Sequence, residues 1–229
     1  MDERLAKLLH LVTEDVITTG EPVGSQRIVD AYKLTVSSAT IRNWFTELEE
    51  AGFVSQPHTS SGRMPTEKGY RTYIEELMES KPLSRHDRHM LEKAIENIDD
   101  PDKRSKELAK AISERIGNAV ILGLHRSDSF YTGLSQLFSQ PEFRDWNRVV
   151  NLGEILDRLD DVLAGIREQR YPAPQVLIGQ ECPFGSACGS ILLTMPNGSL
   201  MAILGPMRMD YRFGISLLQA GRELLKSSI

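Results

Sequence analysis

Cysteine is scarce in this chain, which has two among 229 residues, Cys182 and Cys188. Five residues separate them and no histidine lies nearby, so the spacing fits neither a zinc site nor a thioredoxin-type redox pair. We expect both to be ordinary packing or loop residues in a reducing compartment. The sequence predicts no metal site and no cofactor.

Long apolar runs are also missing. The N-terminal residues "MDERLAKLLHLVTEDV" carry acids from the second position, unlike a signal peptide, and no stretch approaches the roughly 20 apolar residues of a membrane span. We therefore expect a cytoplasmic protein with no membrane partner. A composition of 40% hydrophobic and 26% charged residues is typical of a globular protein and argues against disordered or fibrous classes.

The chain has no excess of positive charge, since its net charge is −5. This argues against a protein that coats nucleic acid without selectivity. A specific DNA binder is not excluded, because it needs only a local positive surface and phosphate attraction decays over about 8 Å at physiological salt. Residues 25–71 form such a region, with six Lys or Arg against five Asp or Glu.

Helical spacing dominates the first fifty residues. The pattern predicts three helices, over residues 4–17, 26–34 and 39–51. Ser25 is expected to cap the second helix, and Ser37 or Ser38 the third. Short helices joined by a brief turn are typical of a helix-turn-helix.

The third helix has two distinct faces. Its apolar stripe is expected to be buried and consists of Ile41, Trp44, Phe45 and Leu48. The opposite face carries Ala39, Arg42, Asn43 and Thr46. In the major groove, Arg and Asn can make bidentate bonds to guanine and adenine, and Ala or Thr can meet a thymine methyl. Taken alone, this face is equally compatible with an ordinary solvated helix surface. We also assign Ser25, Gln26, Ser38 and Thr40 to the candidate DNA interface.

The segment "GFVSQPHTSSGRMPT" predicts two short strands joined by a Gly-containing turn. A hairpin directly after a helix of this kind indicates a winged helix. The expected wing residues are His58, Thr59, Ser60, Ser61 and Arg63, followed by Lys68 and Arg71. They are candidates for phosphate or minor-groove contacts, and the sequence leaves open which residue makes which contact.

The same segment could suggest catalysis, with Ser60 or Ser61 as nucleophile and His58 as base. Hydrolytic catalysis also needs an orienting third group and oxyanion donors, which the segment does not supply. "TSSGR" lacks the ending of a phosphate-binding P-loop as well. We therefore expect a protein that is not an enzyme.

The second half mixes helices and strands, which indicates an α+β fold class. Strands are expected at "AVILGLH", "QVLIG", "GSILLTM" and "SLMAILG", with Asn197-Gly198 as a two-residue hairpin loop. Helices are expected over residues 147–169 and 211–226, and two charged helices, broken near Asp100, precede the first strand. The expected domains are 1–79, a helical linker or dimerisation segment at 80–117, and 118–229.

Three polar residues of the second half are candidates for a structural or sensory role: Glu181, Arg208 and Asp210. We expect Arg208 and Asp210 to form an ion pair between a strand end and the last helix. A small-molecule pocket in this region stays an alternative.

Together, "TGEPVGSQRI", "SSATIRNWFTELEEAGFVSQPHTSSGRMPTEKGYRTYIEEL", "GLSQLFSQPEF", "IGQECPFG" and "GPMRMDY" resemble the HrcA family, bacterial repressors of heat-shock chaperone genes. The resemblance implies an N-terminal winged helix-turn-helix and a C-terminal GAF-like α+β domain. It also implies a homodimer on a double-stranded inverted-repeat operator, known as CIRCE, and assistance from the GroEL chaperonin.

One departure from the family concerns the middle of the chain. Family members carry a long region there that includes an inserted dimerisation domain, but about fifty residues separate Tyr73 from Gly123. We expect most of this insert to be missing and dimer contacts to come from the helical region and the C-terminal domain. An alternative function is an interaction module, or a regulator whose GAF-like domain senses a ligand or partner unrelated to heat shock.

Overall fold

The computed structural model describes residues 1–58, 61–125 and 128–226. The chain divides into two compact units, Met1–Glu79 and Ser80–Ile229. Each is described here by itself.

The first unit begins with α1 (Glu3–Thr19), which buries Leu9 and Val12 completely. Asp2 caps its N-terminus by accepting a hydrogen bond from the Arg4 amide at 3.0 Å. At the other end Gly20 adopts φ 72° and its amide bonds back to the helix. A left-handed residue suits glycine, which explains why the helix ends there.

Two further helices follow, α2 (Ser25–Tyr32) and α3 (Ser38–Glu50), which confirms the predicted helix-turn-helix elements. Ser37 caps α3 by accepting a hydrogen bond from the Thr40 amide at 3.1 Å. The predicted cap of α2 is wrong, because Ser25 is its first helical residue and Gly24 takes the extended cap position without a side-chain bond.

The predicted hairpin is present as β1 (Val54–Ser55) and β2 (Met64–Pro65), which pair antiparallel. An additional bridge joins Arg63 to Val23, so the chain between α1 and α2 lies beside the hairpin. At Gly62 an added Cβ would lie 2.3 Å from the Val23 carbonyl carbon, so only glycine fits this approach. A helical segment follows, α4 (Glu67–Thr72), which continues as a π-helical turn (Tyr73–Leu77).

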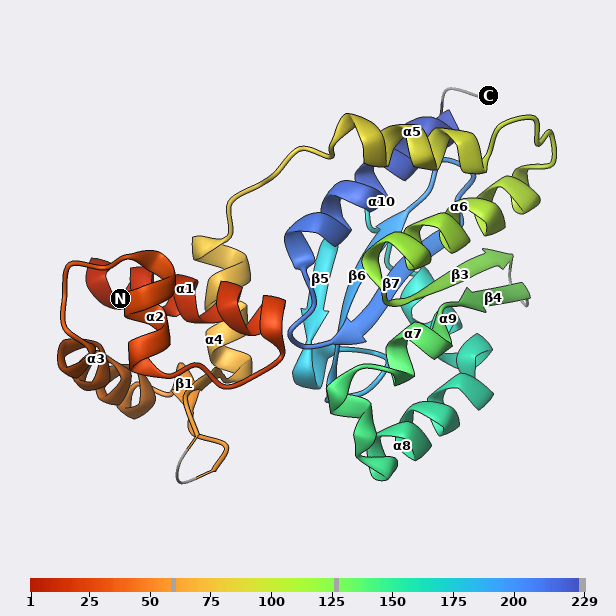
Figure 1. Ribbon diagram of the computed structural model, residues 1–229. Helices are drawn as coiled ribbons and strands as arrows, with labels where there is room; N and C mark the ends of the chain where they lie inside the picture. Colours follow the sequence, from red (N-terminus) through yellow and green to blue (C-terminus); the bar gives the residue numbers. More distant parts are fainter. Residues whose placement is uncertain (59–60, 126–127, 227–229) are drawn as a thin grey trace. The chain divides into compact units, whose positions relative to one another are not determined.

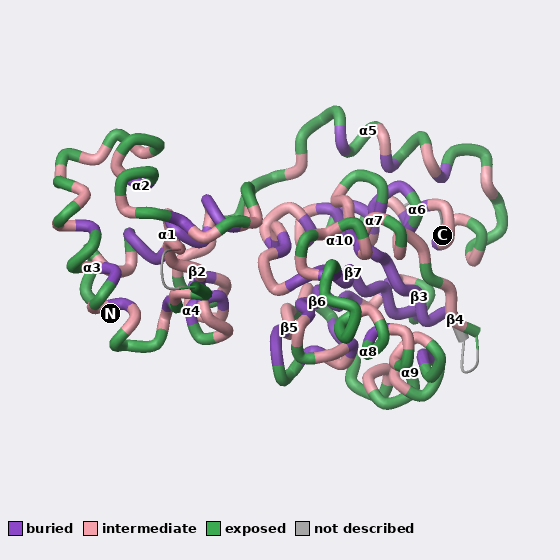
Figure 2. Tube along the Cα trace, turned by 60° about the horizontal axis from the view of Figure 1, so that its bottom comes forward, coloured by how far each residue is buried: buried purple, intermediate pink, exposed green. Residues whose placement is uncertain are grey.

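The second unit is built on one antiparallel sheet in the order β4-β3-β7-β6-β5. Its strands are β3 (Ala119–His125), β4 (Asp128–Thr132), β5 (Gln175–Ile178), β6 (Cys188–Thr194) and β7 (Leu200–Pro206). The central strand β7 is buried along its whole length (Figure 2). Burial on both faces means that helices must cover both sides of the sheet.

Two groups of helices provide this cover (Figure 1). The first group consists of α5 (Arg85–Ala94), α6 (Pro101–Ile116) and α10 (Tyr211–Lys226). Ile191 and Ile203 pair across β6 and β7 and approach α10 at Gly214. The second group consists of α7 (Leu134–Phe138), a 3-10 helix (Pro141–Arg144), α8 (Trp146–Asp157) and α9 (Leu159–Arg167). It packs on the alternate strand residues, such as Leu192 and Ala202. This layered arrangement confirms the α+β prediction and the GAF-like C-terminal domain.

Three details of the second unit differ from the sequence prediction. The expected helix over 147–169 is two helices, because Arg158 leaves helical geometry at φ −117°. The hairpin is where Asn197-Gly198 predicted it, but Met195 pairs with Ser199 and leaves a three-residue loop. Strand β4 was not predicted. The charged region 80–117 contains α5 and α6 as expected, and both belong to the second compact unit.

Within the described ranges, none of the helices combines the length and apolar character needed to cross a membrane.

Candidate nucleic-acid interface

The outer face of α3 is the strongest candidate surface for DNA. Ile41 and Leu48 are fully buried and Phe45 is 4% exposed, as predicted, while Trp44 is half-buried beneath the Arg4 guanidinium. The four residues predicted to face outward are all exposed: Ala39, Arg42, Asn43 and Thr46. The helix therefore keeps its apolar stripe in the core and presents a small polar surface to solvent.

Among the arginines of the first unit, Arg42 differs from the others in its ion pairing. Four of its five arginines have carboxylate partners within 3.3 Å: Arg4, Arg27, Arg63 and Arg71. Arg42 has no ion-pair or hydrogen-bond partner for its side chain among the described residues, and the same holds for Asn43. A guanidinium and an amide that fold contacts do not use are available for an external ligand.

Arg63 lies at the base of the wing, where it contacts α3. Its Nη2 atom is 2.8 Å from Oε2 of Glu49, its Nε donates to the same oxygen, and its side chain is only 18% exposed. The neighbouring bridge to Val23 fixes the backbone as well. This arginine therefore ties the wing to the helix, and the phosphate or minor-groove contact predicted for it stays a prediction.

The wing turn is organised by its own side chains. Ser61 Oγ accepts a hydrogen bond from the His58 amide at 3.0 Å and donates to the His58 carbonyl at 2.7 Å. Gln56 donates to the Ser61 carbonyl. Ser61 thus holds the backbone of His58, while the His58 side chain is exposed. Thr59 and Ser60, which were predicted to contact DNA, lie outside the described residues.

Lys68 and Arg71 make contacts within the first unit. Lys68 Nζ donates to the Ala51 carbonyl at 2.8 Å and lies 4.3 Å from the centre of the Phe53 ring. A cation at this position satisfies the C-terminal end of α3 and complements its dipole. Arg71 pairs with Glu67 one turn away. Both side chains therefore have stabilising roles that the sequence prediction did not include.

The remaining candidates flank the exposed face of α3. Thr40 shares a 3.0 Å hydroxyl contact with the Ser37 cap, and Ser38 and Ser25 are half-buried. Gln26 is exposed and donates to Asp30 within α2. Thr46 uses its hydroxyl on the Arg42 carbonyl, so its methyl group is the part left to contact a base.

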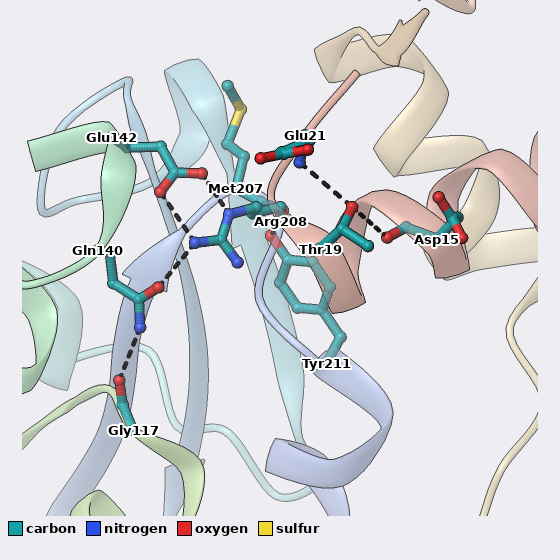
Figure 3. A network of polar contacts seen from close by, with 9 residues as sticks. All are labelled: Asp15, Thr19, Glu21, Gly117, Gln140, Glu142, Met207, Arg208 and Tyr211. Atoms are coloured by element: carbon teal, nitrogen blue, oxygen red, sulfur yellow. Dashed lines mark hydrogen bonds and ion pairs between the residues drawn. The ribbon is translucent and has the colours of Figure 1, made fainter. Parts of the chain in front are cut away.

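In the second unit, two of the motifs seen in the sequence meet. Arg208 of "GPMRMDY" donates to both carboxylate oxygens of Glu142 and, at 2.7 Å, to Oε1 of Gln140, both in "SQPEF" (Figure 3). Gln140 in turn donates to the Gly117 carbonyl at 3.0 Å. The predicted pair of Arg208 with Asp210 is wrong, because Asp210 caps α10 by accepting from the Phe213 amide. The sequence analysis did not consider Gln140 and Glu142 of "QPE" as partners for Arg208, although an amide and a carboxylate two residues apart can both accept from one guanidinium.

The other candidates of this unit have no evident chemical role. Glu181 is exposed on a 3-10 turn (Gly179–Glu181). Cys182 and Cys188 are buried free thiols, as expected of packing residues. Burial raises the pKa of Cys182, and it raises the pKa of Cys188 to about 12, which disfavours the reactive thiolate form of both side chains.

The second unit also contains a cavity of about 350 Å³ beside α5, α6 and α10. Arg115 lines it, paired with Asp87 and lying 4.8 Å from the centre of the Phe213 ring. The arginine holds the pKa of Asp87 below its usual value through a hydrogen bond. Further lining residues are Lys81, Leu83, Asp210 and Arg212. The lining mixes charged groups with apolar surface, as small-molecule sites do.

Comparison with known proteins agrees with the resemblance seen in the motifs. A family model described as the HrcA protein C terminal domain matches residues 57–215. The heat-inducible transcription repressor HrcA of Thermobifida fusca (strain YX) is 35% identical over 171 residues, which is 73% of this chain and 49% of that protein. Its counterpart in Parafrankia sp. (strain EAN1pec) is 40% identical over 119 residues, 51% of this chain and 35% of that protein. The chain spans half or less of the length of these relatives.

Among solved structures, a crystal structure of a hypothetical protein at 2.2 Å resolution has the same fold. Its TM-score is 0.81 and the match covers 100% of this chain and 98% of that one, at 16% identity. Since a family model matches most of the chain and the family's motifs occur in both units, the chain belongs to the HrcA family.

Proposed function

We propose that this chain is a sequence-specific DNA-binding repressor of heat-inducible chaperone genes, acting in the cytoplasm as a dimer on an inverted-repeat operator of the CIRCE type. The observation that carries the proposal is the exposed pair of Arg42 and Asn43 on α3, whose side chains have no partner among the described residues. Their chemistry fits the edges of guanine and adenine. The relatives' own name, heat-inducible transcription repressor, supports the same class of function.

The mechanism assigns separate tasks to the parts of the first unit. In the proposed complex α3 enters the major groove, where Arg42 and Asn43 read bases and Ala39 and the Thr46 methyl contact thymine. Arg63 sets the position of the wing through Glu49, and His58 at the exposed turn meets the backbone or the minor groove. Repression follows from occupying the operator and needs no catalytic step.

A binding experiment with two duplexes tests this proposal. The inverted repeat found upstream of the host's chaperone genes and a scrambled duplex of equal composition are titrated at several salt concentrations. Wild-type protein should prefer the repeat, and Arg42→Ala should reduce that preference by about 1 to 3 kcal/mol. Lys7→Ala is the matched control, because it removes an exposed cation outside α3. Equal binding of both duplexes by the wild type contradicts the proposal.

The family resemblance further suggests that GroEL assists the repressor. We propose this partner for the active form of the chain, and the operator assay tests it directly. Protein refolded with GroEL and ATP should yield a larger DNA-binding fraction than protein refolded alone. An unchanged DNA-binding fraction contradicts the proposed role of GroEL and leaves the proposal of operator binding unaffected.

A second candidate function, a regulator that responds to a small ligand, is favoured by the cavity beside α10. Lys81, Arg115 and Arg212 give it an excess of cations over Asp87 and Asp210, so a small organic anion is the matching chemistry. Benzoate and inorganic phosphate are suitable probes. A thermal shift with either probe that Lys81→Ala abolishes, together with altered operator binding, would favour this candidate.

A further inference from the structure

Helix α8 carries an exposed apolar stripe that the proposed DNA interface does not use. Trp146 is 72% exposed and Val150, one turn later, is 40% exposed. Both belong to the few large apolar side chains that lie open to solvent in the described part of the chain. The opposite flank of the helix buries Leu152 in the core of the second unit, so α8 is anchored while Trp146 and Val150 stay exposed.

The same stripe contains a gap that matches its largest side chain. Gly153 lies seven residues after Trp146, two helical turns along the same face. An added Cβ at Gly153 would meet no atom within 4 Å, so nothing in the described part of the chain requires a glycine at this position. Glycine inside a helix is unfavourable compared with alanine, which makes a packing role toward another molecule the better explanation.

We infer that α8 pairs antiparallel with α8 of a second copy of this chain, with Trp146 of each copy packing over Gly153 of the other. A two-fold axis that passes midway between Val149 and Val150 places Trp146 of each copy opposite Gly153 of the other. This follows because the same point is also midway between Trp146 and Gly153 along the helix. A two-fold contact must be self-complementary, and a protrusion and a gap at equal distances from the axis satisfy this condition.

Charge at the two ends of α8 agrees with this arrangement. Arg144 lies just before the helix and Asp157 at its last residue; both are exposed and neither has an ion-pair partner among the described residues. Antiparallel pairing brings Arg144 of one copy toward Asp157 of the other. The helix dipoles also oppose each other, which is favourable. A parallel arrangement would place like charges together at each end.

The size of the stripe limits the strength of the pairing. One helix face is smaller than the roughly 800 Å² that each partner contributes to a standard interface. The pairing is therefore a concentration-dependent equilibrium, strengthened when two copies are held on one operator. This consequence rests on the proposed function, whereas the pairing itself is tested without DNA.

Disulfide trapping tests the geometry. Val150→Cys lies next to the axis and should form a reducible dimer under mild oxidation in dilute solution. Asn151→Cys is the matched control, because it is exposed on the same helix about 100° further around. The native Cys182 and Cys188 are buried and do not compete. Equal cross-linking at both positions, or none at Val150→Cys, overturns the inference.

Sedimentation equilibrium measures the affinity of the self-association. Trp146→Ala should weaken self-association at least tenfold, and Gly153→Leu should do the same by filling the gap. Trp146 is exposed and an added Cβ at Gly153 meets no atom within 4 Å, so the thermal melt should change little in either variant. A wild-type protein that stays monomeric at every accessible concentration also overturns the inference. Binding of a single half-site, measured in parallel, should persist in both variants; its loss in the wild type would instead count against the proposed function.

Discussion

Glu49 on α3 and Arg63 beside β2 join the proposed DNA-reading helix to its wing, with Nη2 of the arginine 2.8 Å from Oε2 of the carboxylate. The pair connects positions fourteen residues apart and neutralises one positive charge next to the surface proposed to face DNA. Arg63 therefore links the wing to α3, and its positive charge becomes available to other partners only when Glu49 is neutralised.

Glu49→Gln should release this charge. We expect tighter binding to duplexes of any sequence and a salt dependence steeper by about one phosphate contact, because a free guanidinium can reach the backbone. Titrations at several salt concentrations measure both effects. Glu50→Gln is the control, since Glu50 is exposed and has no ion pair among the described residues. Indistinguishable salt slopes for the two variants would show that Arg63 stays at the base of the wing.

Gly62→Ala should destabilise the first unit by about 1 to 3 kcal/mol, because its Cβ would collide with the Val23 backbone 2.3 Å away. Gly24→Ser is the contrasting change, because Gly24 occupies an extended cap position with open space around its Cβ. It should be neutral or stabilising, since serine caps helices well. Urea unfolding followed by Trp44 fluorescence measures both. A neutral Gly62→Ala would mean that the wing is not held against Val23.

Arg208→Met should cost the second unit roughly 2 kcal/mol or more, because it leaves the largely buried Glu142 carboxylate without its partner. The double variant Arg208→Met, Glu142→Gln should recover part of this loss, since no uncompensated charge is then left behind. Chemical unfolding of the wild type, Arg208→Met, Glu142→Gln and the double variant completes this double-mutant cycle. Strict additivity of the two single changes would mean that the pair is not coupled.

Acid should weaken the second unit through Asp87. Hydrogen bonds from Arg115 and Ser84 lower the pKa of this buried carboxyl in the folded state. A lowered folded pKa gives stability that is present above the unfolded value of about 3.9 and is lost as pH falls through the folded pKa. The stability advantage of wild type over Asp87→Asn should therefore be constant near neutral pH and shrink below about pH 4. Unfolding curves at several pH values measure it, and an advantage that persists at low pH would contradict this assignment.

Local signals predicted the helices of the first unit well. The faces of α3 followed from its apolar spacing, because a helix with one buried stripe leaves little freedom in how its other residues point. Capping was harder to predict. Ser25 was the expected cap, but the cap position falls on Gly24, whose neighbour Val23 is held by the bridge to Arg63, a contact across forty residues.

Charged side chains limited the prediction of the site. Arg42, Arg63 and Lys68 look alike in a sequence, yet Arg63 and Lys68 have partners within the fold, whereas Arg42 has none among the residues that the structure describes. Which cation is free depends on carboxylates and carbonyls that are brought near only in three dimensions. The same reason explains the wrong partner predicted for Arg208, whose true partner Glu142 lies 66 residues away.

The outward face of α3 has one more consequence. Ala39, Arg42 and Asn43 take no part in the core, so the fold places few demands on which residues occupy these positions. If α3 reads the operator as proposed, changes at these positions would retarget the protein to a different operator and leave its folding intact. Under the proposed function, the choice of operator and the stability of the fold would rest on separate sets of residues within the first unit.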